Sequence, residues 1–146
     1  MFSKPQFTKK EIADLNSSYQ NAIYEVYYGD RTIRLFIDRH NPLLDSILEQ
    51  YQVTTWALIT AHNPYSQCLS AEENQQRHQL LIELVRSQNL IFFDGVGKDK
   101  DGAWTPEPSL FIIGIKLKRA ISIGNKFQQN AIVFGELKQA SQLIWL

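Results

Sequence analysis

A cluster of short polar and titratable side chains follows the apolar segment 54–60 and continues into the next segment with a helical pattern. If segment 54–60 is a central strand, the loop at its carboxyl end lies where ligands collect in sheets built of crossover units. The first turn of the helix beyond it offers free amides and a positive dipole end to an anion. The cluster therefore predicts a ligand-binding site whose candidates are Thr60, His62, Asn63, Ser66, Asn74, Arg77 and His78.

The same cluster also has a structural interpretation, and both stay open at this point. Asn63-Pro64 favours a turn. Residues 70–73, SAEE, form a capping box that satisfies the free amides of a helix start. The cap does not account for Asn74, Arg77 or His78, of which the first and last share one face of the helix.

A second candidate group lies in the turn-rich segment 96–108 and at the start of the strand that follows it. It consists of Trp104, Glu107 and Ser109. A carboxyl group held beside an apolar ring can have a raised pKa and act as a general acid or base. In the structural alternative, Glu107 bonds backbone amides at the start of a strand and Trp104 covers the edge of the core.

Other motifs are incomplete. Gly97-Lys98 is followed by Asp99 where a phosphate loop needs Ser or Thr, and the acidic residues nearby lack the spacing of a calcium loop. The single cysteine, Cys68, cannot form an internal disulfide and gives no zinc-ligand set. We therefore expect no cofactor and no metal.

Charge and hydropathy exclude several classes of partner. Fifteen Lys and Arg residues balance fifteen Asp and Glu residues, so no net positive field would gather a polyanion. We expect no nucleic-acid partner. The chain has no run of about 18 apolar residues, and its first residues lack the apolar core of a signal peptide. We expect a soluble, cytoplasmic protein with no membrane contact.

Hydrophobic periodicity and turn signals predict the elements that position these residues. Paired strands alternate with helices, which favours an α+β architecture: a mixed, mainly antiparallel sheet with helices packed on it. We expect an N-terminal extension with a short helix over 1–20 and one domain over 21–146. Along helix 70–88, Leu80, Leu81, Leu84 and Val85 are expected to face the core. The other predicted elements are helices 8–18, 41–51 and 117–128 and strands 22–28, 31–37, 54–60, 90–95, 109–115, 130–136 and 142–146.

Several segments together resemble a known family. They include WALITAHNPYSQ (56–67), EENQQRHQLL (72–81), GVGKDKDGAWTPEPSLFIIGI (95–115) and QNAIVFGE (129–136). In this order they resemble the small bacterial family known as domain of unknown function 3293, over residues 21–146. The resemblance implies a single compact domain and brings no catalytic residue, substrate or cofactor with it.

Three functional hypotheses follow. The first is a binding or regulatory module whose polar pocket, between 60–78 and 95–109, takes a partner protein or a small polar ligand. The alternative is a small hydrolase or transferase acting on a polar or phosphorylated substrate, with Glu107 or His62 as general base and Arg77 holding an anion. The third is a regulatory subunit that binds along the edge of the terminal hairpin 130–146. The sequence leaves open whether the protein is an enzyme.

Overall fold

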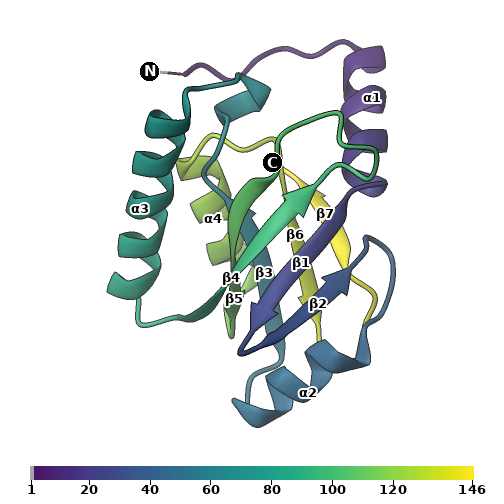
Figure 1. The fold of residues 1–146 in the computed structure, drawn as a ribbon, viewed down its shortest axis with the longest axis vertical. Coiled ribbons are helices and arrows are strands. Elements are labelled where there is room, and N and C mark those ends of the chain that lie inside the picture. Colours follow the sequence, from purple (N-terminus) through teal and green to yellow (C-terminus); the bar gives the residue numbers. More distant parts are fainter. Residues whose placement is uncertain (1) are drawn as a thin grey trace.

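The computed structural model describes residues 2–146 as four α-helices and one seven-stranded sheet (Figure 1). The strand order is β2-β1-β4-β5-β3-β6-β7, and every neighbouring pair is antiparallel. The predicted α+β class is confirmed. The helices are α1 Lys9–Gln20, α2 Pro42–Gln50, α3 Ala71–Ser87 and α4 Leu117–Lys126; the strands are β1 Ile23–Tyr28, β2 Arg31–Leu35, β3 Thr55–Thr60, β4 Ile91–Lys98, β5 Glu107–Ile113, β6 Ala131–Glu136 and β7 Gln142–Trp145.

The helix starts are fixed by local hydrogen bonds. At α1, the Thr8 hydroxyl accepts from the Glu11 amide and the Glu11 carboxylate accepts from the Thr8 amide, both at 3.1 Å. Ser70 and Glu73 form the same capping box at α3, with bonds of 3.1 and 3.3 Å. The box predicted at residues 70–73 is confirmed. Each satisfies amides that a helix start leaves free, which contributes about 1 kcal/mol.

The first hairpin also follows its sequence signals. Gly29, at φ +62°, takes the left-handed conformation that the tight turn between β1 and β2 requires. Alternation along β1 sends successive tyrosines to opposite faces of the sheet. Tyr24 is buried in the core, whereas Tyr27 is 40% exposed on the other face.

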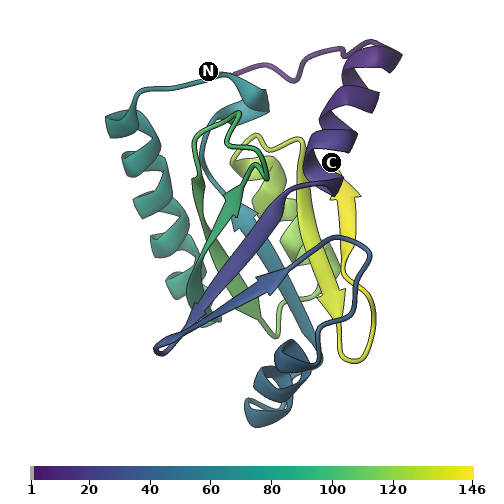
Figure 2. The same ribbon diagram turned by 45° about the vertical axis from the view of Figure 1, so that its right-hand side comes forward.

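Helices α3 and α4 cover one face of the sheet (Figures 1 and 2). Leu81 and Val85 of α3 are fully buried there, together with Ile123 of α4. The prediction that Leu80 faces the core was wrong, since its side chain is 56% exposed. Leu80 lies about 100° around the helix from Leu81, so only one of the two can point at the sheet.

Helix α2 covers only one end of the opposite face. Its residues Leu44, Ile47 and Leu48 are buried in the core, and the Tyr51 ring that follows packs edge-on against Phe93 at 5.9 Å. The first residues of β1 and β5, with the last of β3, form the other end of this face. This end lies away from α2, near α1.

Helix α1 packs beside β7. The Tyr19 and Trp145 rings meet edge-on at 5.7 Å, and the Trp145 indole donates to the Asn16 side chain at 3.0 Å. The division of the chain at residue 20 stays a prediction, and residue 1 of that extension lies outside the described residues. These contacts nevertheless place α1 next to the far end of the sheet.

The long connection between β4 and β5 is shorter than expected. Strand β4 continues to Lys98 and pairs with β5 as far as Gly97 opposite Glu107. The loop is therefore 99–106. The Asp99 carboxylate shapes it by accepting from the amides of Asp101 and Ala103 at 3.1 and 2.7 Å. Throughout residues 2–146, no helix has the length and apolar character needed to cross a bilayer.

Candidate functional site

A pocket of about 860 Å³ lies at the end of the sheet that α2 leaves uncovered. Its walls come from four separate parts of the chain: α1, the loop after β3, the 99–106 loop with the start of β5, and the residues before β6. Polar and apolar side chains share the lining. They include Ser18, Tyr19, Asn63, Ser66, Lys98, Asp99, Trp104, Thr105, Glu107, Gln129 and Asn130.

Glu107 is the first residue of β5 and lies half-buried in the pocket. Burial raises the pKa of its carboxyl to about 7, and hydrogen bonding from the Asn63 side chain offsets only part of that rise. Across residues 2–146 the ion pairs do not include Glu107. The carboxyl is therefore poised to change its charge near neutral pH, with no cation to balance it.

A small inner cavity of about 70 Å³ continues from the pocket toward the core. Glu107 and three aromatic residues, Tyr19, Tyr24 and Trp104, line it. Gly97 leaves room here, since an added Cβ would lie 3.5 Å from the Tyr24 ring and 4.0 Å from the Trp104 ring. The cavity therefore has three aromatic rings and one carboxyl group in a wall that is otherwise largely aliphatic, with Leu58, Ile132, Val133 and Leu143 among its members.

Tyr24 stays neutral in this cavity. Its pKa is raised, first by burial and then by the negative charges that Tyr19 and Glu107 would carry. Its hydroxyl donates to the main-chain carbonyl of Tyr19 at 3.1 Å. This bond ties the end of α1 to the cavity wall.

Asn63 is held in the pocket by its neighbours. Its backbone is left-handed, at φ +49°, a conformation that asparagine tolerates well. Its side-chain oxygen accepts from the Leu69 amide and from the Asn74 side chain, at 3.1 and 2.9 Å. Asn74, which is buried, also accepts from the Asn63 amide at 2.9 Å. Asn74 thus positions Asn63, whose NH₂ group is left to bond Glu107.

Thr60 and Ser109 line the inner cavity, but their hydroxyl groups bond the main chain. Thr60 donates to the Pro108 carbonyl at 2.8 Å, and Ser109 donates to the Glu107 carbonyl at 3.0 Å. The accepting carbonyl groups are those of Glu107 itself and of the residue that follows it. These two candidates therefore fix the backbone that carries the carboxyl.

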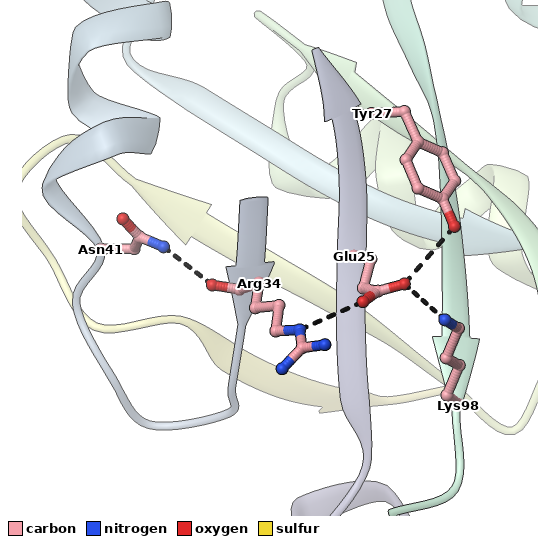
Figure 3. A network of polar contacts seen from close by, with 5 residues as sticks. All are labelled: Glu25, Tyr27, Arg34, Asn41 and Lys98. Carbon is pink, nitrogen blue, oxygen red and sulfur yellow. Dashed lines mark hydrogen bonds and ion pairs between the residues drawn. The ribbon is translucent and has the colours of Figure 1, made fainter. Parts of the chain in front are cut away.

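Lys98 does not supply the missing positive charge. Its ammonium group bonds the Glu25 carboxylate at 2.7 Å, and Arg34 approaches the same carboxylate at 3.2 Å (Figure 3). Glu25 is 4% exposed, and the hydrogen bond from Lys98 is the main cause of its lowered pKa. The ammonium group of Lys98 is thus engaged by a carboxylate of a neighbouring strand.

Arg77 lies outside the pocket, on the far side of the loop that follows β3. Its guanidinium donates to the Ala61 carbonyl at 2.6 Å, to the Phe127 carbonyl and to the Gln128 side chain at 3.0 Å. These bonds satisfy one carbonyl group directly after β3 and another at the end of α4, and they join α3 to both. The structure gives Arg77 a structural role and does not bring it to Glu107.

His62 and His78 also lie outside the pocket. Their rings meet edge-on at 6.0 Å, and one nitrogen of each, Nε2 of His62 and Nδ1 of His78, is buried without a hydrogen-bond partner. Burial lowers both pKa values, that of His62 to about 4. Both rings are therefore neutral at physiological pH. His78 lines a separate groove beside Tyr27.

The pocket residues that the sequence analysis did not propose include Tyr19, Gln129 and Asn130. Asn130 donates to the Tyr19 hydroxyl at 3.1 Å and to the Ser66 hydroxyl at 2.9 Å. Gln129 donates to the His62 carbonyl at 3.0 Å. The available signal was the Gln-Asn pair placed directly before an apolar strand, in a segment that contributed to the family resemblance.

Metal ligation has no support in the part of the chain described. Nowhere in residues 2–146 do three or more His, Cys, Asp or Glu side chains come together as a metal site. Cys68 is a free thiol at the rim of the pocket.

Comparison with known proteins identifies a family for this chain and no function. No curated protein matches the chain, and no solved structure does. A family model described as a protein of unknown function (DUF3293) matches residues 59–132. The matched segment contains Asn63, Trp104, Glu107 and Gln129, whereas Tyr19 lies before it. The chain belongs to the DUF3293 family.

Proposed function

We propose that the protein is a binding module that takes a small polar molecule in the pocket around Glu107. The observation that carries this proposal is a half-buried carboxyl without a balancing cation. Such a group costs stability in the folded protein, and active or binding sites are where such costs are commonly found. The NH₂ groups of Gln129 and Asn130 already donate within the protein, but no hydrogen bond within residues 2–146 reaches their side-chain oxygens, which can accept from a ligand.

The enzymatic alternative has less support. It requires Glu107, His62 and Arg77 to converge on one substrate. Neither His62 nor Arg77 lines the pocket that contains Glu107. The guanidinium of Arg77, which was to hold the anion, already donates to main-chain carbonyls. A phosphorylated substrate would meet Glu107 and Asp99 with no unpaired cation in the pocket wall.

A ligand screen with site mapping tests the proposal. Purified protein is screened by thermal shift against sugars, nucleosides, amino acids, amines and carboxylic acids, because a ligand bound only by the folded state raises Tm. Each compound that raises Tm is then mapped by amide chemical shifts in NMR spectra. We expect the shifts to gather in the 63–68 and 99–107 segments. Shifts confined to the α3–α4 side, or no binding by any class of compound, would contradict the proposal.

A pocket-filling variant provides the control. Gly97→Val extends a side chain toward the Tyr24 and Trp104 rings and fills the inner cavity, whereas Gly97→Ala adds only a Cβ at ordinary contact distances. The valine variant should lose most of the binding and the alanine variant should keep it. Equal binding by both variants would place the ligand elsewhere.

A further inference from the structure

We propose that the pocket recognises an alkylammonium group, which enters the inner cavity between the aromatic rings and meets the Glu107 carboxylate. This inference rests on the proposed function and names the chemical class of its ligand. It follows from the composition of the cavity wall, from the charge balance of the pocket and from the position of the carboxyl group.

Part of the cavity wall has the chemistry that attracts an organic cation, and the aliphatic remainder suits the methyl or methylene groups of such a ligand. Tyr19, Tyr24 and Trp104 line the cavity, and their ring faces carry negative electrostatic potential. The Tyr24 and Trp104 rings both approach the bare backbone of Gly97, at 3.5 and 4.0 Å from the position of an added Cβ. The volume of about 70 Å³ suits a small head group and not a whole metabolite. The rest of the ligand would occupy the outer pocket.

The charge balance of the pocket favours a cation over an anion. Glu107 and Asp99 both line the outer pocket. Lys98, the one Lys or Arg side chain in its described lining, is bonded to Glu25 at 2.7 Å (Figure 3). An entering anion would therefore face two carboxyl groups, while the Lys98 ammonium is held by Glu25. An ammonium group would neutralise Glu107 in a site shielded from water, where such an interaction is strongest.

The carboxyl group lies where the head group must pass. Glu107 lines both the outer pocket and the inner cavity. The hydroxyls of Thr60 and Ser109 hold the carbonyl groups of Pro108 and of Glu107 itself, and Asn63 approaches the Glu107 side chain. Its position is therefore set before any ligand arrives, which reduces the entropy lost on binding.

The same geometry makes binding depend on pH. The other titratable side chains of the described lining of the two cavities are Tyr19, Tyr24, Cys68, Lys98 and Asp99. Burial raises the Glu107 pKa to about 7, so the fraction of ionised carboxylate changes most around neutrality. Because only the carboxylate attracts a cation, affinity for an alkylammonium ligand should rise with pH across this range.

Calorimetric titration with matched probes tests the inference. Choline is compared with the uncharged alcohol in which carbon replaces its quaternary nitrogen, and n-butylammonium with butanol. We expect both cations to bind more tightly than their neutral partners. For wild type, their affinity should rise about tenfold between about pH 6 and about pH 8, in step with the ionised fraction of Glu107.

Two variants separate charge from aromatic contact. Glu107→Gln keeps the shape of the side chain and should lower cation affinity at about pH 8 by tenfold or more, with no remaining pH dependence. Trp104→Leu keeps the carboxyl and should weaken choline binding several-fold while the rise with pH persists. Thermal unfolding of each variant confirms that it is folded.

Three results would overturn the inference. One is equal binding of the charged and neutral partners, and another is cation binding that Glu107→Gln leaves unchanged. The third is failure of both cations to bind while a neutral or anionic compound from the ligand screen shifts the amides of segment 99–107. This third result would leave the proposed binding function intact, whereas failure of every class of compound would remove both.

Discussion

Replacing the half-buried carboxyl of Glu107 should make the protein more stable at alkaline pH. The folded structure raises the Glu107 pKa from its ordinary value of 4.5 to about 7. At about 1.4 kcal/mol per pKa unit, ionising this carboxyl costs the folded protein about 3 kcal/mol. Glu107→Gln removes that cost because an amide stays neutral at every pH.

The sign follows from proton linkage. Between pH 4.5 and about 7 the folded protein holds a proton on Glu107 that the unfolded chain has released. Stability therefore falls as the pH rises through this range, and the loss is complete above about pH 7. In Glu107→Gln this loss is absent. The free energy of unfolding of the variant, relative to that of wild type, should therefore increase by about 2 kcal/mol or more from about pH 5 to about pH 8.

Urea denaturation of both proteins at several pH values measures this difference. Comparing variant with wild type at each pH cancels the titration of the histidines, which both proteins share. Glu136→Gln is the matched control, since Glu136 is exposed and its replacement removes one charge elsewhere on the surface. A stability difference that does not change with pH would refute the burial of the Glu107 carboxyl.

Three further predictions concern the residues around the site. Burial lowers the pKa of His62 to about 4, so the folded state resists protonation of this ring. The free energy of unfolding should therefore fall as the pH drops below 6.5. Unfolding followed by circular dichroism should show a smaller fall in His62→Gln. Arg77→Met leaves two carbonyl groups and one side-chain amide without their charged donor and should cost about 3 kcal/mol in urea denaturation. Gly135→Ala places a Cβ 2.3 Å from the Trp56 ring and should cost about 2 kcal/mol or more, measured as a lower Tm.

Matched variants control for these changes. Arg119→Met removes a guanidinium with a single bond, at 3.2 Å to the side chain of Gln88, and should cost less than about 1 kcal/mol. Gly97→Ala, whose Cβ would have 3.5 Å to its nearest neighbour, should change Tm little. Three results would contradict the packing described. One is a pH profile of stability that is the same in His62→Gln as in wild type. The others are equal losses of stability in Arg77→Met and Arg119→Met, or in Gly135→Ala and Gly97→Ala.

Much of the fold could be predicted from the sequence because its signals are local. The capping boxes at Thr8 and Ser70 join residues three apart, and the Gly29 turn involves only neighbouring positions. Apolar alternation and helical spacing gave the order of helices and strands. These patterns are short-range, so each segment shows them independently of the rest of the chain. Their sum was enough for the α+β class.

The candidate site was only partly predictable. Asn63, Ser66, Trp104 and Glu107 were proposed from residue type and do line the pocket. Arg77 was equally attractive by type, yet its partners at the end of α4 lie about fifty positions further along the chain, at 127 and 128. A sequence shows which side chains can form hydrogen bonds. It does not show whether their partner is a ligand or the protein backbone.

The sequence by itself determined which segments become helices and strands and which polar side chains were available. Only the tertiary structure decided that Asn130 would bond the Tyr19 hydroxyl, 111 positions away, and that α2 would leave one end of the sheet uncovered. The order β2-β1-β4-β5-β3-β6-β7 brings β4 and β5 between strands from distant parts of the chain. Glu107 and α1 line one pocket because long-range packing selects that order, and no local pattern encodes it.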